Sequence, residues 1–339
     1  MELGKAIELR DNDYDHLLKA YEERTGLCWT ELVDINFPCP RSISVVIPAR
    51  NVSYSIGLVL DSLMRSKTTA KLEVIVVDDG STDATPHIAR MHSLSPRVVV
   101  LPSQKGRSIA RNVGTAIAKG ETILYLDADI IVPDHVIHEY ALRAADGLIT
   151  FGFRQGIQLG DPDHPAPGQA LVAKPDIEAD HRVCWYPNDG QVLYSNPSLK
   201  KPGPLRLLDD TYDLRGLGWG ANYHGLTLPH MLAGFMMSMP RTAVINVGGF
   251  DTEFIGWGME DTHLGAKLIA AGLKVVPLRS TAGFHIDPHD IDEQWKIKLA
   301  DFPSNKELYY QRLTEPAPSN LKNYFMSEAG KMLKLSKVY

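Results

Sequence analysis

Four apolar runs rich in β-branched residues constrain the fold of this 339-residue chain more than any other feature. They end in polar residues, and polar segments with helical character separate them. Such runs are typical of strands buried on both faces of a parallel sheet. The alternation of strand and helix predicts an α/β protein with a single, mostly parallel, twisted sheet flanked by helices. The predicted strands cover residues 42–48, 72–77, 98–101 and 123–126, and the predicted helices cover 56–65, 85–92 and 106–119.

The last of these runs stops at two carboxylates one residue apart, Asp127 and Asp129. Residues i and i+2 of an extended segment face the same side, so both can point at one spot beyond the strand end. Carboxylate oxygens are hard ligands that suit Mg2+ or Mn2+, and such an ion commonly bridges to phosphate. The alternative for a bare Asp-x-Asp is a solvated turn.

Composition excludes several classes of protein. The 35 basic and 41 acidic residues give a net charge of −6, without the basic excess of a nucleic-acid binder. Three cysteines without zinc-site spacing favour a reducing, cytoplasmic location. The start of the chain has no apolar signal core, and no apolar run has the length of a membrane span. A basic amphipathic helix predicted over 321–338 is compatible with peripheral membrane contact or with packing on its own domain.

Four ordered motifs give the first half of the chain a family resemblance. They look like the nucleotide-binding half of a family 2 type glycosyltransferase with the glycosyltransferase-A fold. The resemblance implies that Asp127 and Asp129 bind a metal ion. It also implies that Pro48, Arg50 and Asp79 line the base and ribose pocket, with Asp78, Arg111 and Ala128 close to the nucleotide. The four motifs are VVIPARN, VIVVDDGSTD, KGRSIARNVG and YLDAD, between residues 43 and 134.

A second constellation lies at 248–261, where GGFD is followed by Gly-Trp-Gly and an acidic pair. It resembles the acceptor-side motif shared by family 2 enzymes and the galactosyltransferase type family. Glu260 and Asp261 fall at a predicted helix N-terminus, where the macrodipole favours charged carboxylates and lowers their pKa. We expect Asp261 to act as the base on the acceptor and Glu260 to hold the acceptor.

Three further predictions complete the candidate site. In metal-dependent relatives a histidine downstream of the acidic pair completes the coordination, and His285 has that place here, with His289 as a substitute. Trp257 and Gly258 are expected to form a wall of the sugar and acceptor pocket, because flanking glycines allow close approach to a ligand. Trp219, between glycines in a long loop, is expected to close on a sugar, or alternatively to anchor that loop.

These motifs predict a metal-dependent glycosyltransferase that uses Mn2+ or Mg2+ and a nucleotide-diphosphate sugar. The resembled families mostly use uridine diphosphate sugars, and the acidic pair favours inversion. The acceptor, which the sequence does not define, is a glycan, a peptide, a lipid-linked molecule or a small molecule. A retaining transferase, a sugar-nucleotide nucleotidyltransferase and a non-catalytic carbohydrate-binding protein remain alternatives, although no Gly-rich triphosphate loop follows the first strand.

The chain is predicted to divide into five segments. A helix over 5–24, closed by Gly26 as C-cap, belongs to the first. The third is rich in Pro, Gly, Asp and Asn, which is typical of a functional loop region. The segments are a helical N-terminal extension (1–40), a nucleotide-sugar-binding half (41–155), a loop-rich acceptor and lid region (156–230), an acceptor-side catalytic half (231–290) and a helical C-terminal extension (291–339).

Overall fold

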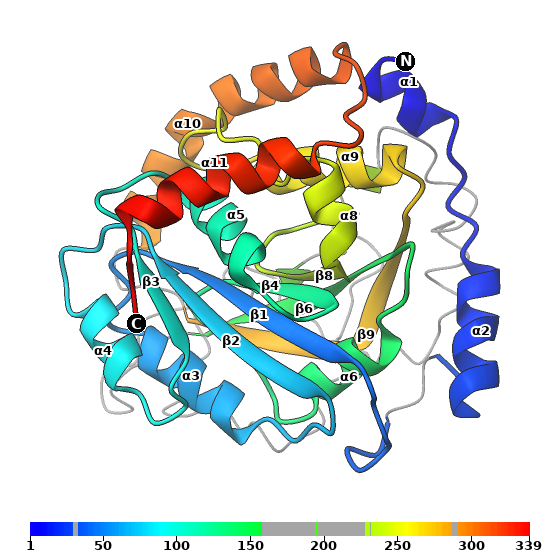
Figure 1. The fold of residues 1–339 in the computed structure, drawn as a ribbon, viewed down its shortest axis with the longest axis horizontal. Coiled ribbons are helices and arrows are strands. Elements are labelled where there is room, and N and C mark those ends of the chain that lie inside the picture. Colours follow the sequence, from blue (N-terminus) through cyan, green and yellow to red (C-terminus); the bar gives the residue numbers. More distant parts are fainter. Residues whose placement is uncertain (30–32, 158–193, 196–227, 231, 287–290) are drawn as a thin grey trace.

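In the computed structural model the described residues are 1–29, 33–157, 194–195, 228–230, 232–286 and 291–339. They form one large twisted sheet with helices on both faces (Figure 1). The helices are α1 (Leu3–Glu8), α2 (Asp15–Thr25), α3 (Ile56–Arg65), α4 (Thr85–Met91), α5 (Arg107–Ile117), α6 (Val136–Arg143), α8 (Arg241–Asn246), α9 (Glu260–Ala270), α10 (Ile291–Leu313) and α11 (Lys322–Leu335). The strands are β1 (Ser42–Ala49), β2 (Lys71–Asp78), β3 (Arg97–Val100), β4 (Thr122–Leu126), β5 (Ile130–Ile131), β6 (Leu148–Ile157), β7 (Tyr194–Ser195), β8 (Met236–Pro240), β9 (Lys274–Ile286) and β10 (Lys337–Val338).

The sheet order is β10-β3-β2-β1-β4-β8-β6-β9-β5, and β7 pairs with β6. Strands β1 to β4 are parallel, as the repeated strand–helix pattern predicts. β8 runs antiparallel between β4 and β6, and β9 is parallel to β6. The predicted α/β fold with a mostly parallel sheet is therefore confirmed.

The apolar runs form strands because both of their faces are buried. Successive side chains of a strand point to opposite faces, so alternate residues enter different cores. Val46 and Tyr125 pack on the α5, α8 and α9 side of the sheet. Val45 and Leu124 pack on the other side, with α3 and α6. A continuous apolar run, rather than an alternating one, is what such a two-sided burial requires.

The N-terminal extension differs from the single helix predicted over 5–24. The structure has two helices, α1 and α2, separated by a non-helical segment. Asn12 in that segment bonds with its side chain to the backbone of Val275 on β9, which replaces the helical hydrogen bonds there. Gly26 does cap α2 as predicted, with φ +71° and its N–H bonded to the Glu22 carbonyl at 2.7 Å.

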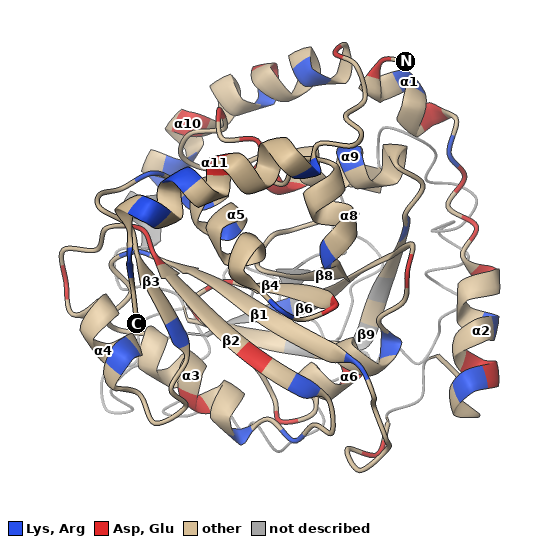
Figure 2. Cartoon of the chain, in the orientation of Figure 1, with Lys and Arg blue, Asp and Glu red and all other residues tan. Residues whose placement is uncertain are grey.

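The C-terminal helix α11 packs on the protein's own domain. Phe325 and Ala329 are buried, and α11 lies against α5 and α8. Its lysines lie on the exposed side of the helix (Figure 2). Lys331 pairs there with Glu328 at 2.6 Å. Within the described residues no helix is both long and apolar enough to cross a membrane. Trp219 and His289, and nearly all of the predicted lid region 156–230, lie outside the described residues.

Candidate active site

The carboxylate of Asp79 positions the start of α5. Asp79 follows β2 and accepts hydrogen bonds from the backbone N–H groups of Lys105 and Gly106, at 2.6 and 2.9 Å. Gly106 has a φ of +100°, a conformation that residues with a side chain rarely adopt. Burial raises the pKa of Asp79, although the two N–H groups and nearby Arg50 act in the opposite direction. Asp79 therefore fixes the turn that presents Arg107.

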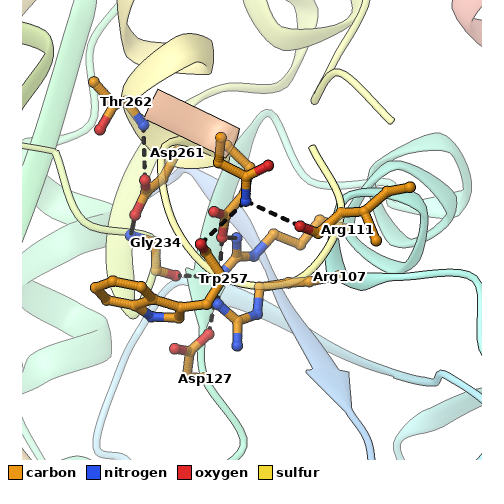
Figure 3. A network of polar contacts seen from close by, with 10 residues as sticks. Arg107, Arg111, Asp127, Gly234, Trp257, Asp261 and Thr262 are labelled. Atoms are coloured by element: carbon orange, nitrogen blue, oxygen red, sulfur yellow. Dashed lines mark hydrogen bonds and ion pairs between the residues drawn. The ribbon is translucent and has the colours of Figure 1, made fainter. Parts of the chain in front are cut away.

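Arg111, one turn further along α5, is the centre of the polar network in Figure 3. Its side chain is 1% exposed. The guanidinium donates to Glu260 Oε1 at 3.1 Å, to Asp127 Oδ1 at 3.0 Å and to the Gly234 carbonyl at 3.1 Å. It also lies over the Phe250 ring, 5.1 Å from the centroid. One buried cation thus joins the end of β4 to the start of α9.

The two carboxylates after β4 have different partners. Asp127 is bound to Arg111, whereas Asp129 Oδ2 lies 3.4 Å from His285 Nε2. The antiparallel pairing of β5 with β9 brings Asp129 and His285 together, since Ile130 is in register with His285. Among the described residues, no three His, Cys, Asp or Glu side chains form a group able to hold a metal ion. The three-ligand set of Asp127, Asp129 and His285 stays a prediction.

One oxygen of the Asp129 carboxylate lacks a partner. Asp129 Oδ1 is buried and accepts no hydrogen bond in the described structure. A buried carboxylate oxygen without a donor is costly, and in native proteins it usually has an explanation such as an ion or water. Oδ1 of Asp129 can therefore accept a hydrogen bond or coordinate a cation.

The other predicted nucleotide residues lie at the ends of β1 and β2. Pro48 is half-buried in β1, and Arg50 follows that strand on the surface. Asp78 is fully buried at the end of β2, and its Oδ2 accepts a hydrogen bond from the Ser81 N–H at 3.1 Å. Ala128, between the two carboxylates, is buried, and its carbonyl accepts from the Ser55 hydroxyl at 2.8 Å. The parallel pairing of β1 with β2 and β4 brings these positions to one edge of the sheet.

Three residues of the loop before α9 have a positive φ. Gly256, Gly258 and Met259 have φ values of +81°, +100° and +71°. A Cβ on Gly258 would lie 2.8 Å from the Phe302 ring of α10. Positions 256 and 258 therefore require glycine, and α10 packs closely against the loop.

Helix α10 also fixes Trp257. Asn305 donates to the carbonyls of Ile255 and Trp257, each at 3.0 Å. The half-buried Trp257 ring packs against Phe302, with 5.6 Å between the centroids. Figure 3 places Trp257 beside Arg107, Asp127 and the start of α9.

The acidic pair opens α9 as predicted, but its two members are bound differently. Glu260 is 4% exposed, and Oε1 accepts from Arg107 at 3.3 Å and from Arg111 at 3.1 Å. Asp261 Oδ2 accepts from the Gly234 N–H at 2.7 Å, and Oδ1 from the Thr262 N–H at 2.8 Å. Glu260 is thus ion-paired, while neutral backbone donors hold Asp261.

This difference corrects one expectation from the sequence. A lowered pKa is predicted for both carboxylates, and it is wrong for Asp261. Burial, and then the neighbouring charge of Glu260, raise the pKa of Asp261 to about 6. Burial also acts to raise the pKa of Glu260, but Arg107 and Arg111 outweigh it and the pKa is lowered. The helix N-terminus matters less here than burial and the charges nearby.

Two basic residues of the site carry no signal in the sequence. Burial acts to raise the pKa of Asp129, but the charges of His285, Arg154 and Lys298 outweigh it and lower that pKa. Arg154 comes from β6, where its guanidinium lies 4.9 Å from the centroid of the Phe235 ring. Lys298 comes from α10, a charged helix in the predicted C-terminal extension. Only the folded arrangement shows that both lie near Asp129.

Comparison with known proteins agrees with this architecture. The profile of the family described as "Glycosyl transferase family 2" matches residues 44–178, and that described as "N-terminal domain of galactosyltransferase" matches residues 223–289. Validoxylamine A glucosyltransferase from Streptomyces hygroscopicus subsp. jinggangensis is 29% identical over 267 residues, which cover 73% of this chain and 56% of that protein. The chain thus spans about half the length of this curated relative.

Two solved structures share the fold. The mannosyltransferase from Pyrobaculum calidifontis, in complex with GDP-Man and Mn2+, has a TM-score of 0.53 and 18% identity, covering 96% of this chain and 80% of its own. GalNAc-T7 with UDP, GalNAc and Mn2+ has a TM-score of 0.50 and 15% identity, covering 96% of this chain and 65% of its own. The sheet and its flanking helices have the glycosyltransferase-A fold. Residues 44–178 and 223–289 are thus similar to the two families whose motifs the sequence resembles.

Proposed function

We propose that the protein transfers a sugar from a nucleoside diphosphate donor, preferably a uridine diphosphate sugar, to an acceptor nucleophile with inversion. The observation that carries this proposal is the position of Asp261. Its carboxylate is held by two backbone N–H groups next to the Arg111 network, and its pKa is raised to about 6. A carboxylate with that pKa can accept a proton near neutral pH while remaining largely ionised.

The donor diphosphate is proposed to lie at the sheet edge formed by the ends of β1, β2 and β4. Arg50 and Asp79 are at the nucleoside end, and Asp127 and Arg111 are at the phosphate end. Arg107 extends the positive charge toward solvent, since its side chain is 36% exposed. Cations fixed before the reaction stabilise the charge that develops on the departing diphosphate.

The neighbouring Asp129 and His285 support the proposal of a divalent ion such as Mn2+ or Mg2+ at this position. Asp129 has a buried oxygen without a donor, and the neighbouring His285 supplies an imidazole nitrogen. Asp129 and His285, together with Asp127, would hold the ion. When bound, such an ion neutralises charge on the diphosphate leaving group. Arg154 and Lys298 add positive charge around Asp129.

In the proposed reaction Asp261 takes the proton from the acceptor hydroxyl. The acceptor oxygen then forms its bond to the anomeric carbon as the bond from that carbon to the diphosphate oxygen breaks. The diphosphate leaves with the electron pair, on the side of Arg107 and Arg111. Glu260 is predicted from the sequence to hold the acceptor. The ion pairs of Glu260 support a different role, in which it holds Arg107 and Arg111 in position.

The acceptor is proposed to approach over the Trp257–Gly258 loop, which α10 holds in place. Trp219 and the rest of 156–230 remain candidates for acceptor contacts and a lid. The five predicted segments of the chain are kept as a proposal for how these tasks divide along the sequence.

Thermal-shift measurements on the full chain test the donor class. Uridine and guanosine diphosphate sugars are each added with and without Mn2+. Ligand binding to the native state increases the free energy of unfolding and so raises the melting temperature. At a ligand concentration of 100 times the Kd, the increase in free energy is about 2.7 kcal/mol. We expect the largest shift with a uridine diphosphate sugar plus Mn2+, and loss of the Mn2+ dependence in Asp129→Ala. A larger shift with guanosine diphosphate sugars would contradict the donor preference.

The stereochemistry has its own measurement. Once a donor is known, NMR of the transferred sugar gives the anomeric configuration of the product. Inversion is expected from a base placed on the acceptor. Retention would assign the chain to the retaining transferases, and release of pyrophosphate would indicate nucleotidyl transfer.

A further inference from the structure

Side-chain hydrogen bonds join the loop that follows β1 to the loop that follows β2. The first loop covers residues 50–55 and leads into α3, and the second covers 79–84 and leads into α4. Their strands are parallel neighbours, with Ala49 in register with Asp78, so both loops lie at the carboxyl edge of the sheet. We call the hydrogen bonds between residues 51–53 and residues 81–85 the loop bridge.

Asn51 is the centre of the loop bridge. It has a φ of +51°, a left-handed conformation that asparagine adopts more readily than most residues with a side chain. Its N–H donates to Ser81 Oγ at 2.9 Å. Its side-chain oxygen Oδ1 accepts from the Thr82 N–H at 2.8 Å and from the Thr82 hydroxyl at 3.3 Å. The turn at Asn51 is therefore bound to the second loop through both its backbone and its side chain.

Asp83 and Thr85 bind the next two residues of the first loop. The Val52 N–H donates to Thr85 Oγ1 at 2.8 Å, and the Ser53 N–H donates to Asp83 Oδ2 at 3.1 Å. The other oxygen of Asp83 accepts from the Thr85 N–H at 2.9 Å, at the first residue of α4. Three consecutive backbone N–H groups of the first loop are thus bound by side chains that lie outside it.

The loop bridge fixes the backbone that carries Arg50. Arg50 is exposed, so packing does not hold its side chain, and the turn at Asn51 sets the direction in which it leaves the chain. The charge of Arg50 acts to lower the pKa of Asp79, which indicates that the guanidinium lies on that side. In the proposed function Arg50 and Asp79 lie at the nucleoside end. Arg107 and Arg111, at the phosphate end, are carried by α5 and take no part in the loop bridge.

We propose that Asn51 and Asp83 are positioning residues, which preorganise the nucleoside end of the donor site by holding the first loop against the second. This inference rests on the proposed function, because it takes the donor to be a nucleoside diphosphate sugar. A protein that adopts its binding conformation for only a fraction of the time loses affinity by that fraction. The loop bridge therefore sets the affinity for the nucleoside part of the donor and leaves the affinity for the diphosphate part unchanged.

Calorimetry on the full chain with Mn2+ tests this inference. Dissociation constants are measured for uridine diphosphate, guanosine diphosphate and inorganic pyrophosphate. Asn51→Gly removes the side-chain acceptor, while glycine adopts the same positive φ without strain. We expect the Kd of the more tightly bound nucleoside diphosphate to rise about tenfold, as for a binding-competent fraction of about one-tenth. The Kd of pyrophosphate should stay the same.

Asn320→Gly is the matched control, because Asn320 is also exposed and has a φ of +57° just before α11. It should change neither Kd. Asp83→Asn is a second variant of the loop bridge. It keeps the size of the side chain but turns an amide group toward one of the two backbone N–H groups that Asp83 binds. We expect a smaller rise in the nucleotide Kd, about threefold.

Kinetics with an identified donor separate positioning from a general loss of structure. In Asn51→Gly the KM for the donor should rise, while kcat at saturating donor stays the same. Unchanged nucleotide affinity in both Asn51→Gly and Asp83→Asn would overturn the inference and leave the proposed function intact. An equal loss of pyrophosphate affinity would also overturn it. If the wild type bound neither nucleoside diphosphate, the proposed function itself would be wrong, and this inference with it.

Discussion

The two acidic pairs of the active site are held in different ways. Asp127 and Asp129 each have a basic partner, Arg111 and His285 respectively. Of the second pair, Glu260 is ion-paired with two arginines, while Asp261 is bound by backbone N–H groups. A cationic partner lowers the proton affinity of a carboxylate, whereas burial with neutral donors keeps it high. Asp261 is therefore the member of the four suited to take a proton.

The strongest test of this comparison removes the proton acceptor. Asp261→Asn keeps the size of the side chain and one hydrogen-bond acceptor but loses the basic oxygen. We expect kcat to fall roughly 100- to 10,000-fold, the usual contribution of a general base. The free energy of unfolding should change by only about 1 kcal/mol, because one hydrogen bond is lost. Steady-state kinetics and chemical denaturation measure the two quantities.

Asp146→Asn is the matched control for that variant, since Asp146 is an exposed acid between α6 and β6. Its kcat should equal that of the wild type. If Asp261→Asn retained full kcat with a stable fold, the assignment of Asp261 as base would be wrong.

The second test removes the ion-paired member of the same pair. Glu260→Gln removes the buried negative charge that pairs with Arg107 and Arg111. Breaking a buried ion pair typically costs about 3–5 kcal/mol, so we expect a loss of about 3 kcal/mol in the free energy of unfolding. Urea denaturation checks this value.

Glu253→Gln provides the comparison for Glu260→Gln. The Glu253 side chain is 70% exposed and pairs with Arg312 at 2.7 Å, so its loss should cost less than about 1 kcal/mol. Equal losses in the two variants would show that burial does not distinguish the two ion pairs.

The smallest expected effect is the pH dependence. In the proposed reaction Asp261 accepts a proton only when it is ionised, and its pKa is raised to about 6. The value of kcat should therefore be constant above that pH and fall about tenfold per unit below it. A pH profile of kcat from pH 5 to 8 measures this. A kcat that stayed constant down to pH 5 would contradict the raised pKa.

Much of the fold follows from local patterns in the sequence. The runs that form β1, β2 and β4 are apolar throughout, and a strand buried on both faces needs no other signal. The motif residues Asp79 and Asp127 lie at strand ends, so the sheet topology alone brings them to one edge. The start of α9 at Glu260 is likewise visible as an acidic pair after a glycine-rich turn.

Other parts depend on distant contacts that no local pattern encodes. The break between α1 and α2 comes from the bond of Asn12 with β9, more than 260 residues away. Lys298 and Asn305 reach the site only because α10 packs on the Trp257 loop. The raised pKa of Asp261 depends on its burial and on the fact that Glu260, rather than Asp261, pairs with the arginines. The spacing of the two acids in the sequence does not reveal which of them does so.

Gly234 has a consequence for the effects of substitutions in this protein. Its carbonyl accepts from Arg111 and its N–H donates to Asp261, so a residue without a side chain connects the proposed donor side to the proposed base. A Cβ there would lie 2.6 Å from the Arg111 guanidinium, which is itself confined by two carboxylates. Even alanine would displace Arg111. A mutational scan scored by activity would therefore rank Gly234 with the charged residues around it.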